Sequence, residues 1–309
     1  MAFDNDTAGD NRDQLPEDLY AIIAGHRNGT ARPKPGPVSP KIFRLTAVRA
    51  VIFDVYGTLF QSAVGEISLH FDTDPVAPFR ELVETAGAEM DEGRVTELTG
   101  RYYEKIGEVH ESRRALNVEY PEVDVITIWH GLCEEFPELI IDSEGDRFSR
   151  ARRLALLYEL AANPVDPMPG AAETLRSLRD RGQFLGVISN AQFYTPLLFR
   201  PLLGGSPEEL GIALAIWSYE EGEAKPSDRL YSKAVSWFSK AYGLEAHQLL
   251  MVGNDMRNDV VPAAAVGMRT ALFGGDRRSL RLRGENKELS GVSPDVVLTD
   301  LRQLNEVVS

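Results

Sequence analysis

The chain is poor in cysteine and has no long apolar run. Cys133 is its one cysteine among 309 residues, which excludes an intramolecular disulfide framework and is typical of proteins in a reducing compartment. No run of about 18 apolar residues occurs, and the N-terminus is acidic and polar, so the sequence offers neither a membrane span nor a signal peptide. These absences predict a cytoplasmic protein that does not act at a membrane.

Positive charge is also scarce. Lys and Arg number 33 against 47 Asp and Glu, which gives a net charge of -14. A surplus of negative charge disfavours binding to nucleic acid or to anionic membranes. An anionic substrate would therefore need a local positive site. No feature of the composition indicates an oligomeric state.

The chain falls into three parts by composition and periodicity. Residues 1–47 are rich in Asp, Asn, Gly and Pro, which predicts a flexible arm with one possible helix at 19–23. From residue 48 onward short apolar segments alternate with helical patterns, which predicts an α/β fold with a doubly wound parallel sheet. Residues 61–167 carry four segments at helical spacing, so we expect an inserted α-helical domain there and a core made of 48–60 and 168–309. The later strands are expected at residues 184–188, 212–217, 249–252, 269–273 and 296–298.

The most informative segment runs from residue 51 to residue 60. An apolar strand leads directly into Asp54, and Gly57 then breaks the strand. Ligands of open α/β sheets bind at the carboxyl ends of the strands, so Asp54 is a candidate nucleophile. The alternative is an aspartate that only closes a turn.

Three further segments place polar groups at predicted strand ends. Ser189 and Asn190 offer a hydroxyl and an amide that can bind an oxyanion without adding charge; the alternative is that the pair only forms a turn after the strand. Lys225 precedes a proline and is either part of a site or a surface lysine. Asp255 and Asp259 follow a strand at a spacing of four, which indicates either a site for a hard cation or a helix cap.

In this order the segments resemble the haloacid dehalogenase (HAD) superfamily of hydrolases, from about residue 48 to the C-terminus. The resemblance implies a Rossmann-like core, a helical cap inserted after the first motif, and hydrolysis of a small phosphorylated metabolite through an aspartyl intermediate. Thr58 would support the phosphoryl oxygens. The residues that carry the resemblance are Asp54, Ser189, Lys225, Asp255 and Asp259.

The resemblance also implies Mg²⁺. The superfamily holds the ion through the nucleophile, a main-chain carbonyl two residues later and an acid of the last motif, for which Asp255 is the first choice. The charges agree, because three aspartates sum to -3 while Mg²⁺ and Lys225 sum to +3. The implied ligand set is Asp54, Tyr56, Asn254, Asp255 and Asp259, with Asn254 and Asp259 as direct or water-mediated helpers.

Tyr56 departs from the phosphatase pattern, which places a second acid there as general acid and base. A phenol with a pKa of about 10 is a poor substitute and could cost about 10² to 10⁴ in rate. Tyr56, and Tyr231 six residues after Lys225, instead resemble the metal-free 2-haloacid dehalogenases. A dehalogenase and a binding protein without turnover therefore stay open as alternatives. The arginine that would hold a haloacid carboxylate is not identified among Arg80, Arg101, Arg113 and Arg114, and the arginines of 277–283 indicate a solvated surface or the border of the site.

Overall fold

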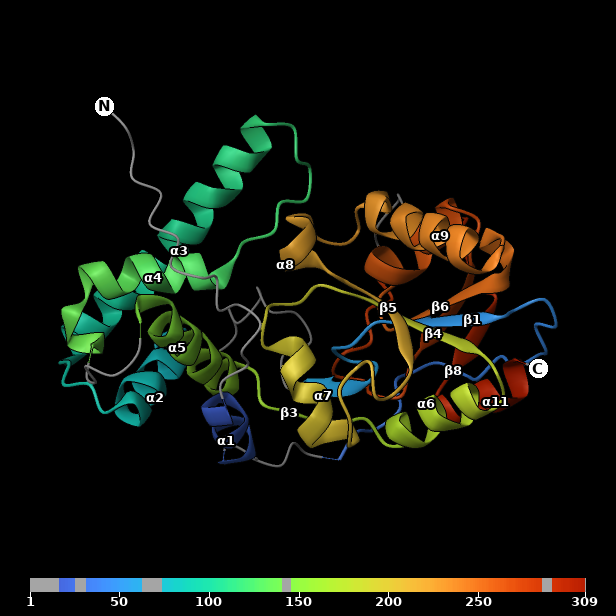
Figure 1. Ribbon diagram of the computed structural model, residues 1–309, viewed down its shortest axis with the longest axis horizontal. Coiled ribbons are helices and arrows are strands. Elements are labelled where there is room, and N and C mark those ends of the chain that lie inside the picture. The colour runs from blue at the N-terminus through green and yellow to red at the C-terminus, as the bar shows by residue number, and fades with distance from the viewer. Residues whose placement is uncertain (1–16, 26–31, 63–73, 141–145, 285–290, 309) are drawn as a thin grey trace.

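The core is a six-stranded parallel sheet with the strand order β5-β4-β1-β6-β7-β8 (Figure 1). The structure, a computed structural model, describes residues 17–25, 32–62, 74–140, 146–284 and 291–308. The strands of this sheet are β1 (Ala50–Phe53), β4 (Phe184–Ser189), β5 (Ile212–Trp217), β6 (Leu249–Gly253), β7 (Arg269–Phe273) and β8 (Val296–Leu298). Its flanking and connecting helices are α6 (Ala171–Asp180), α7 (Thr195–Leu203), α8 (Ser218–Glu221), α9 (Asp228–Tyr242), η3 (Ala246–Gln248), η4 (Met256–Val260), α10 (Val261–Ala265), η6 (Leu301–Gln303) and α11 (Leu304–Val307).

Strand β1 is buried on both faces, as its unbroken apolar sequence predicts. Ala50 and Ile52 belong to the same apolar cluster as Leu230 and Phe238 of α9. The alternate residues of β1 pack into the cluster that contains apolar side chains of α6 and α11. Figure 1 shows α9 on one side of the sheet and α6 and α11 on the other. Helices therefore cover both faces, which confirms the predicted doubly wound parallel sheet.

The register of the sheet brings three strand ends together. Phe53 pairs with Val187 of β4 and with Val252 of β6. The residues that follow these strands consequently lie at one edge, the edge at which open α/β sheets bind their ligands.

A helical insertion connects the first strand to the rest of the core. Strand β2 (Phe60–Ser62) pairs antiparallel with β3 (Val165–Pro167), so the chain leaves and returns by adjacent strands. Between them lie α2 (Ala77–Ala86), α3 (Glu92–Ala115), α4 (Val125–Glu135), η2 (Pro137–Leu139) and α5 (Arg147–Ala162). In the described ranges, no helix combines the length and the apolar character that a membrane crossing would need.

Aromatic side chains form the centre of this insertion. The ring of Tyr158 lies 4.7 Å from that of Phe79 and 4.9 Å from that of Tyr102, centroid to centroid. Trp129 is fully buried against the same rings. The helices thus share an apolar centre of their own. The boundaries at residues 61 and 167 stay a prediction.

The segment before β1 packs against the molecule where it is described. Helix α1 (Glu17–Gly25) buries Leu19 and Ile23 and contacts both α5 and α7. Further along, the amide of Lys41 donates to Val297 O at 2.9 Å and that of Leu45 to Val307 O at 2.7 Å. Much of the predicted flexible arm is therefore held by the core. Residues 1–16 and 26–31 of that arm lie outside the described residues.

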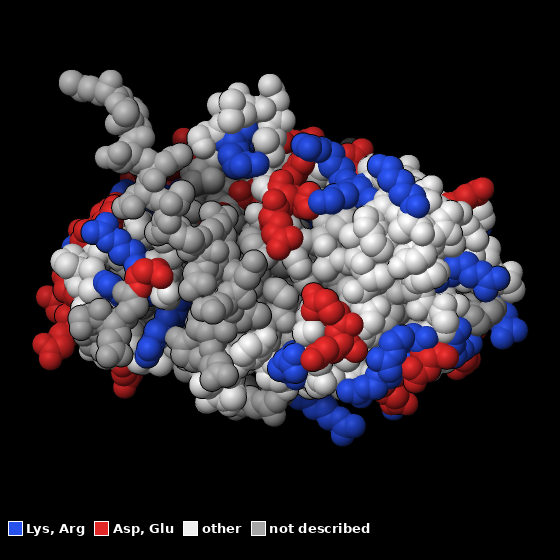
Figure 2. Space-filling model, in the orientation of Figure 1, with Lys and Arg blue, Asp and Glu red and all other residues white. Residues whose placement is uncertain are grey.

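Charged side chains of both signs share the surface of the core. Figure 2 shows acidic side chains over α8 beside basic ones over α9. Lys233 pairs with Glu221, and Arg229 pairs with Glu223 at 2.9 Å. Because ion pairs with an exposed member typically contribute about 0 to 1 kcal/mol, they add little to the stability of the fold.

A buried carboxylate joins the end of α5 to the core. Glu159 accepts hydrogen bonds from Asn163 Nδ2 at 3.0 Å and from the Tyr194 hydroxyl at 2.8 Å. Asn163 Oδ1 in turn accepts from Ser62 Oγ at 2.7 Å. Burial raises the pKa of Glu159, because the charged form loses its hydration and its partners are neutral.

We predict that Glu159→Gln weakens the dependence of stability on pH. A carboxyl group whose pKa is raised by folding contributes its full stability below its ordinary pKa and loses it as the pH rises through the raised value. Gln can accept from Asn163 and donate to the Tyr194 oxygen, so it keeps both contacts. Urea unfolding at about pH 5 and about pH 8 should show a smaller loss of stability in the variant than in the wild type. An equal loss of stability between these two pH values in the variant and the wild type would contradict a raised pKa of Glu159 in the folded state.

Candidate active site

Asp54 lies directly after β1, at the carboxyl edge of the sheet. Its amide donates to Val252 O at 2.9 Å, which continues the pairing of β1 with β6. Gly57 then takes a left-handed conformation with φ of 86°. A Cβ atom at this position would lie 2.7 Å from Asn254 Nδ2 and 2.7 Å from Ser279 Cβ. Gly57 is thus required by both the turn and its close approach to the segment after β6.

A single ammonium group connects two buried carboxylates. Lys225 Nζ donates to Asp54 Oδ1 and to Asp259 Oδ1, at 2.6 Å in each case. Ser189 Oγ donates to the same Asp54 oxygen at 3.1 Å. Asn190 Oδ1 accepts from the backbone amide of Lys225 at 2.7 Å. The structure therefore brings together four of the six predicted catalytic residues, whose roles stay predictions.

The charges of this group do not balance. Burial alone would lower the pKa of Lys225, but Asp259 and Asp54 outweigh it and the pKa is raised. Burial raises the pKa of Asp259, against the attraction of Lys225. One ammonium between two carboxylates leaves one negative charge in excess, which a proton or a metal cation would compensate.

Asp255 is oriented differently from the sequence-based expectation. Arg283 Nη2 lies 2.6 Å from its Oδ2, and Arg283 Nε lies 2.9 Å from its Oδ1. Oδ1 also accepts from the amides of Arg257 and Asn258, so Asp255 caps the π-helical turn η4. The expected convergence of three acids on one cation is not what the structure shows, because a bidentate arginine and a helix terminus occupy this carboxylate.

Asn254 offers an oxygen on the side of the nucleophile loop. Its Nδ2 donates to Ser279 O at 2.6 Å, and its Oδ1 accepts from Thr58 Oγ1 at 3.2 Å. These two contacts fix the orientation of the amide. In the described ranges no cluster of three or more His, Cys, Asp or Glu side chains is arranged for a metal. Mg²⁺ is often held by one or two carboxylates with water, so one carboxylate (Asp54) and neutral oxygens fit such an ion.

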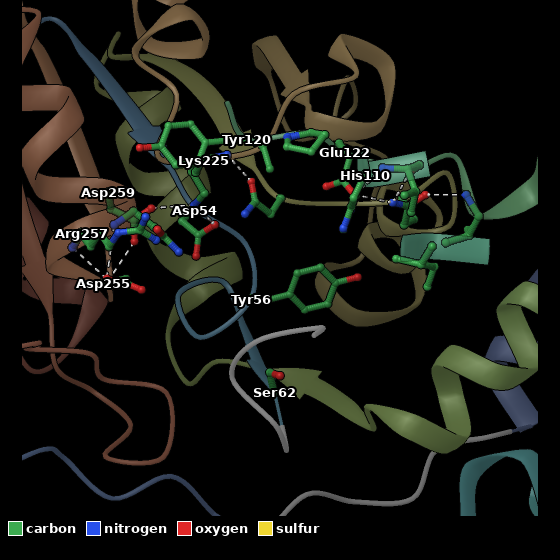
Figure 3. A pocket seen from close by; sticks show the side chains of 18 of the residues that line it. Asp54, Tyr56, Ser62, His110, Tyr120, Glu122, Lys225, Asp255, Arg257 and Asp259 are labelled. Atoms are coloured by element: carbon green, nitrogen blue, oxygen red, sulfur yellow. Dashed lines mark hydrogen bonds and ion pairs between the residues drawn. The ribbon is translucent and has the colours of Figure 1, made fainter. Parts of the chain in front are cut away.

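Tyr56 does not occupy the position of a proton donor. Its hydroxyl lies 2.9 Å from Thr195 Oγ1, and only 7% of the residue is exposed. Figure 3 shows the phenol pointing away from Asp54. Burial raises the pKa of Tyr56 well above its ordinary value, and the nearby Glu159 carboxylate raises it further. This phenol therefore keeps its proton at neutral pH.

A cavity of about 490 Å³ opens in front of Asp54 and extends to the helical insertion. Glu122, Gln192 and Arg283 also line it. The sequence pattern indicates neither Glu122 nor Gln192, whereas Arg283 belongs to the arginine-rich segment 277–283. Arg114 is the one of the four candidate cap arginines that lines this cavity, whereas Arg80 and Arg101 pair with acids of the insertion. Among the other lining residues are Tyr102, Tyr103, His110, Tyr120, Tyr158 and Arg257.

Residues 48–267 match a family of proteins described as haloacid dehalogenase-like hydrolases. The chain belongs to this family. The match runs from just before β1, through the insertion, to the turn and helix after β6. It includes every residue of the site named above except Ser279 and Arg283. The resemblance inferred from the motifs is confirmed.

Proteins similar to this chain include enzymes named as phosphatases. The glyceraldehyde 3-phosphate phosphatase of Pyrococcus furiosus is 31% identical over 46% of this chain and 54% of its own length. The phosphoglycolate phosphatase of Vibrio parahaemolyticus is 30% identical over 46% of this chain and 56% of its own. The chain thus spans about half the length of the curated relatives it matches.

A solved HAD-like structure shows the same fold. A 2-haloacid dehalogenase from Pseudomonas syringae pv. Tomato superposes with a TM-score of 0.51 over 84% of this chain and 97% of its own. The two sequences are 17% identical, so the likeness concerns the fold and not the reaction.

We predict that Lys225→Met destabilises the protein by about 3 to 5 kcal/mol, because it leaves two buried carboxylates without their shared cation. Lys233→Met, which removes an exposed lysine paired with Glu221, should cost less than about 1 kcal/mol. Urea unfolding measures both values. Adding Asp259→Asn to Lys225→Met should recover part of the loss, and a double variant no more stable than the single one would contradict the shared-cation arrangement.

Proposed function

We propose that the protein is a Mg²⁺-dependent hydrolase of small phosphate esters that works through an aspartyl-phosphate on Asp54. The observation that carries this proposal is the position of the Asp54 carboxylate. Two donors, Lys225 Nζ and Ser189 Oγ, fix its Oδ1 at the sheet edge. With one oxygen held, the carboxylate has a fixed direction toward the cavity, as a nucleophile requires.

The phosphatase names of the relatives and the charge of the cavity support this class of substrate. Lys225, Arg257 and Arg283 line the same cavity as Asp54. Arg257 lies over the ring of Tyr120 at 5.7 Å. Lys225 and Arg283 are paired with the aspartates of the site, so the positive charge that an anionic substrate needs in a chain with a net charge of -14 would come from Arg257 and from the bound cation.

Mg²⁺ would be held by the Asp54 carboxylate, the Asn254 amide oxygen and the main-chain carbonyl of Tyr56, with water completing its shell. When bound, it would neutralise charge on the phosphoryl oxygens. Asp255 and Asp259 stay with Arg283 and Lys225 in this arrangement and act as supports of the site. Lys225 orients Asp54, and Asn190 fixes the backbone that carries Lys225.

Asp54→Asn should abolish phosphate release, because an amide oxygen is a far weaker nucleophile than a carboxylate. We expect a fall of at least about 10³-fold in kcat on any ester that the wild type hydrolyses. Phosphate release measured over a panel of phosphate esters and acyl phosphates checks this value. Asp180→Asn, at an exposed position of α6, is the matched control and should keep the wild-type rate. A turnover by Asp54→Asn close to that of the control would overturn the role of Asp54.

Removal of the metal should stop turnover reversibly. EDTA is expected to abolish phosphate release, and excess Mg²⁺ is expected to restore it. Asn254→Ala should raise the Mg²⁺ concentration for half-maximal rate by about tenfold or more, which corresponds to about 1.4 kcal/mol. An Asn254→Ala variant with an unchanged Mg²⁺ requirement would remove Asn254 from the ligand set.

Metal-free hydrolysis of a carbon–halogen bond is the second candidate, and Tyr56 is the observation that favours it. Halide leaves without taking up a proton, so the absence of an acid at position 56 would not slow this reaction. Halide release from 2-chloropropionate in EDTA separates the two candidates. A protein that releases neither halide nor phosphate would instead be a binding protein with the fold of a hydrolase.

A further inference from the structure

The proposed hydrolysis requires a group that protonates the leaving oxygen and then activates water. The residue two positions after the nucleophile is Tyr56, whose hydroxyl is held by Thr195. The acids next to Asp54 are occupied as well, because Asp259 is paired with Lys225 and Asp255 with Arg283. The acid must therefore come from another side of the cavity.

Glu122 reaches the cavity from the segment between α3 and α4. Its amide donates to Gly222 O at 3.3 Å, and the amide of Ala224 donates to Tyr120 O at 2.8 Å. Pro121 and Glu223 form an isolated antiparallel bridge between the same segments. The segment that carries Glu122 is thus attached to the residues that lead directly into Lys225.

The carboxyl group of Glu122 contacts only neutral groups among its described hydrogen-bond partners. Its Oε2 lies 2.6 Å from Ser218 Oγ. Its Oε1 accepts from its neighbour Val123 N at 2.9 Å and from Gln192 Nε2 at 3.3 Å. Burial raises the pKa of Glu122 above that of a free glutamate. These contacts orient the carboxyl group without an ion pair that would hold it ionised.

The other carboxyl groups near the cavity do not combine a position in its lining with burial and neutral hydrogen-bond partners. Glu159 is bonded to Asn163 and Tyr194 and is not among the residues that line the cavity. Glu119 lines the cavity but is exposed to solvent. In Figure 3 Asp54 and Lys225 lie on one side of the cavity and Glu122 on the other, which leaves the space between them for a substrate.

We propose that Glu122 is the general acid and base of this site and replaces the acid that is missing at position 56. This assignment rests on the proposed phosphate-ester hydrolysis. Asp54 attacks phosphorus while the bond from phosphorus to the leaving oxygen breaks, and that oxygen takes the proton of Glu122. The resulting carboxylate then takes a proton from water, and the hydroxide attacks the phosphoryl group on Asp54. The bond to Asp54 breaks, which restores the aspartate, the protonated Glu122 and inorganic phosphate.

The test compares wild type and Glu122→Gln on two kinds of ester with Mg²⁺ present. An amide can accept from Val123 and Gln192 and donate to Ser218, so this variant keeps the contacts of the segment while it loses the acid. 4-Nitrophenyl phosphate has a leaving group that departs without a proton, whereas 2-phosphoglycolate and glyceraldehyde 3-phosphate release alkoxides. Glu111→Gln, at an exposed position of α3 outside the cavity, is the matched control.

We expect Glu122→Gln to lose about 10² to 10³-fold in kcat on the alkyl esters. On 4-nitrophenyl phosphate it should release a rapid burst of about one nitrophenolate per protein and then turn over slowly, because only the attack of water still needs the base. A purely structural role would reduce the burst and the alkyl reaction together.

The outcomes separate the two proposals. If the wild type hydrolyses both kinds of ester and Glu122→Gln either keeps its full rate or loses the burst, the assignment of Glu122 fails while the proposed function stands. A wild type that releases phosphate from 4-nitrophenyl phosphate alone also overturns the assignment. A wild type inactive on every ester rejects the proposed function, and the assignment of Glu122 with it.

Discussion

The arrangement of the site depends on the ammonium group of Lys225 and the two carboxylates that share it. Asp54 follows β1, Lys225 precedes α9, and Asp259 lies in the turn after β6. Their close contact therefore requires three segments from different parts of the chain to meet at the carboxyl edge of the sheet. Gly253 contributes to this contact, because a Cβ atom there would lie 2.2 Å from Asp259 Cγ. The absence of a side chain at this position allows Asp259 to fold back over the strand end toward Lys225.

Much of the fold follows from local sequence patterns. The apolar runs before Asp54 and Ser189 are short, lack interior proline and end in polar residues, so the sequence predicts buried strands there, and the structure has β1 and β4 at these places. Residues 228–242 have apolar positions that recur at helical spacing, which predicts a helix, and the structure has α9 there. The parallel register then brings the strand ends together without further information. These features are predictable because each depends on neighbours in the chain.

The rest of the site depends on contacts that no local pattern encodes. Arg283 meets Asp255 from a loop 28 residues later, and the loop has no periodicity that would place it. Tyr56 stands where the phosphatase pattern has a second acid, and its side chain turns toward Thr195, 139 residues away. With Arg283 included, three aspartates face two cationic side chains, so the group lacks one positive charge rather than two. A divalent ion is therefore less strongly required by charge than the sequence alone implied.

Helix α1 has a consequence for the movement of the helical insertion relative to the core. Its apolar side contacts α5 of the insertion and α7 of the core at once, with Leu19 and Ile23 buried. This helix restrains the insertion relative to the core, because moving one of them away from the other would expose apolar side chains of α1 to water. Opening of the space between insertion and core is thereby coupled to a segment that precedes the first strand.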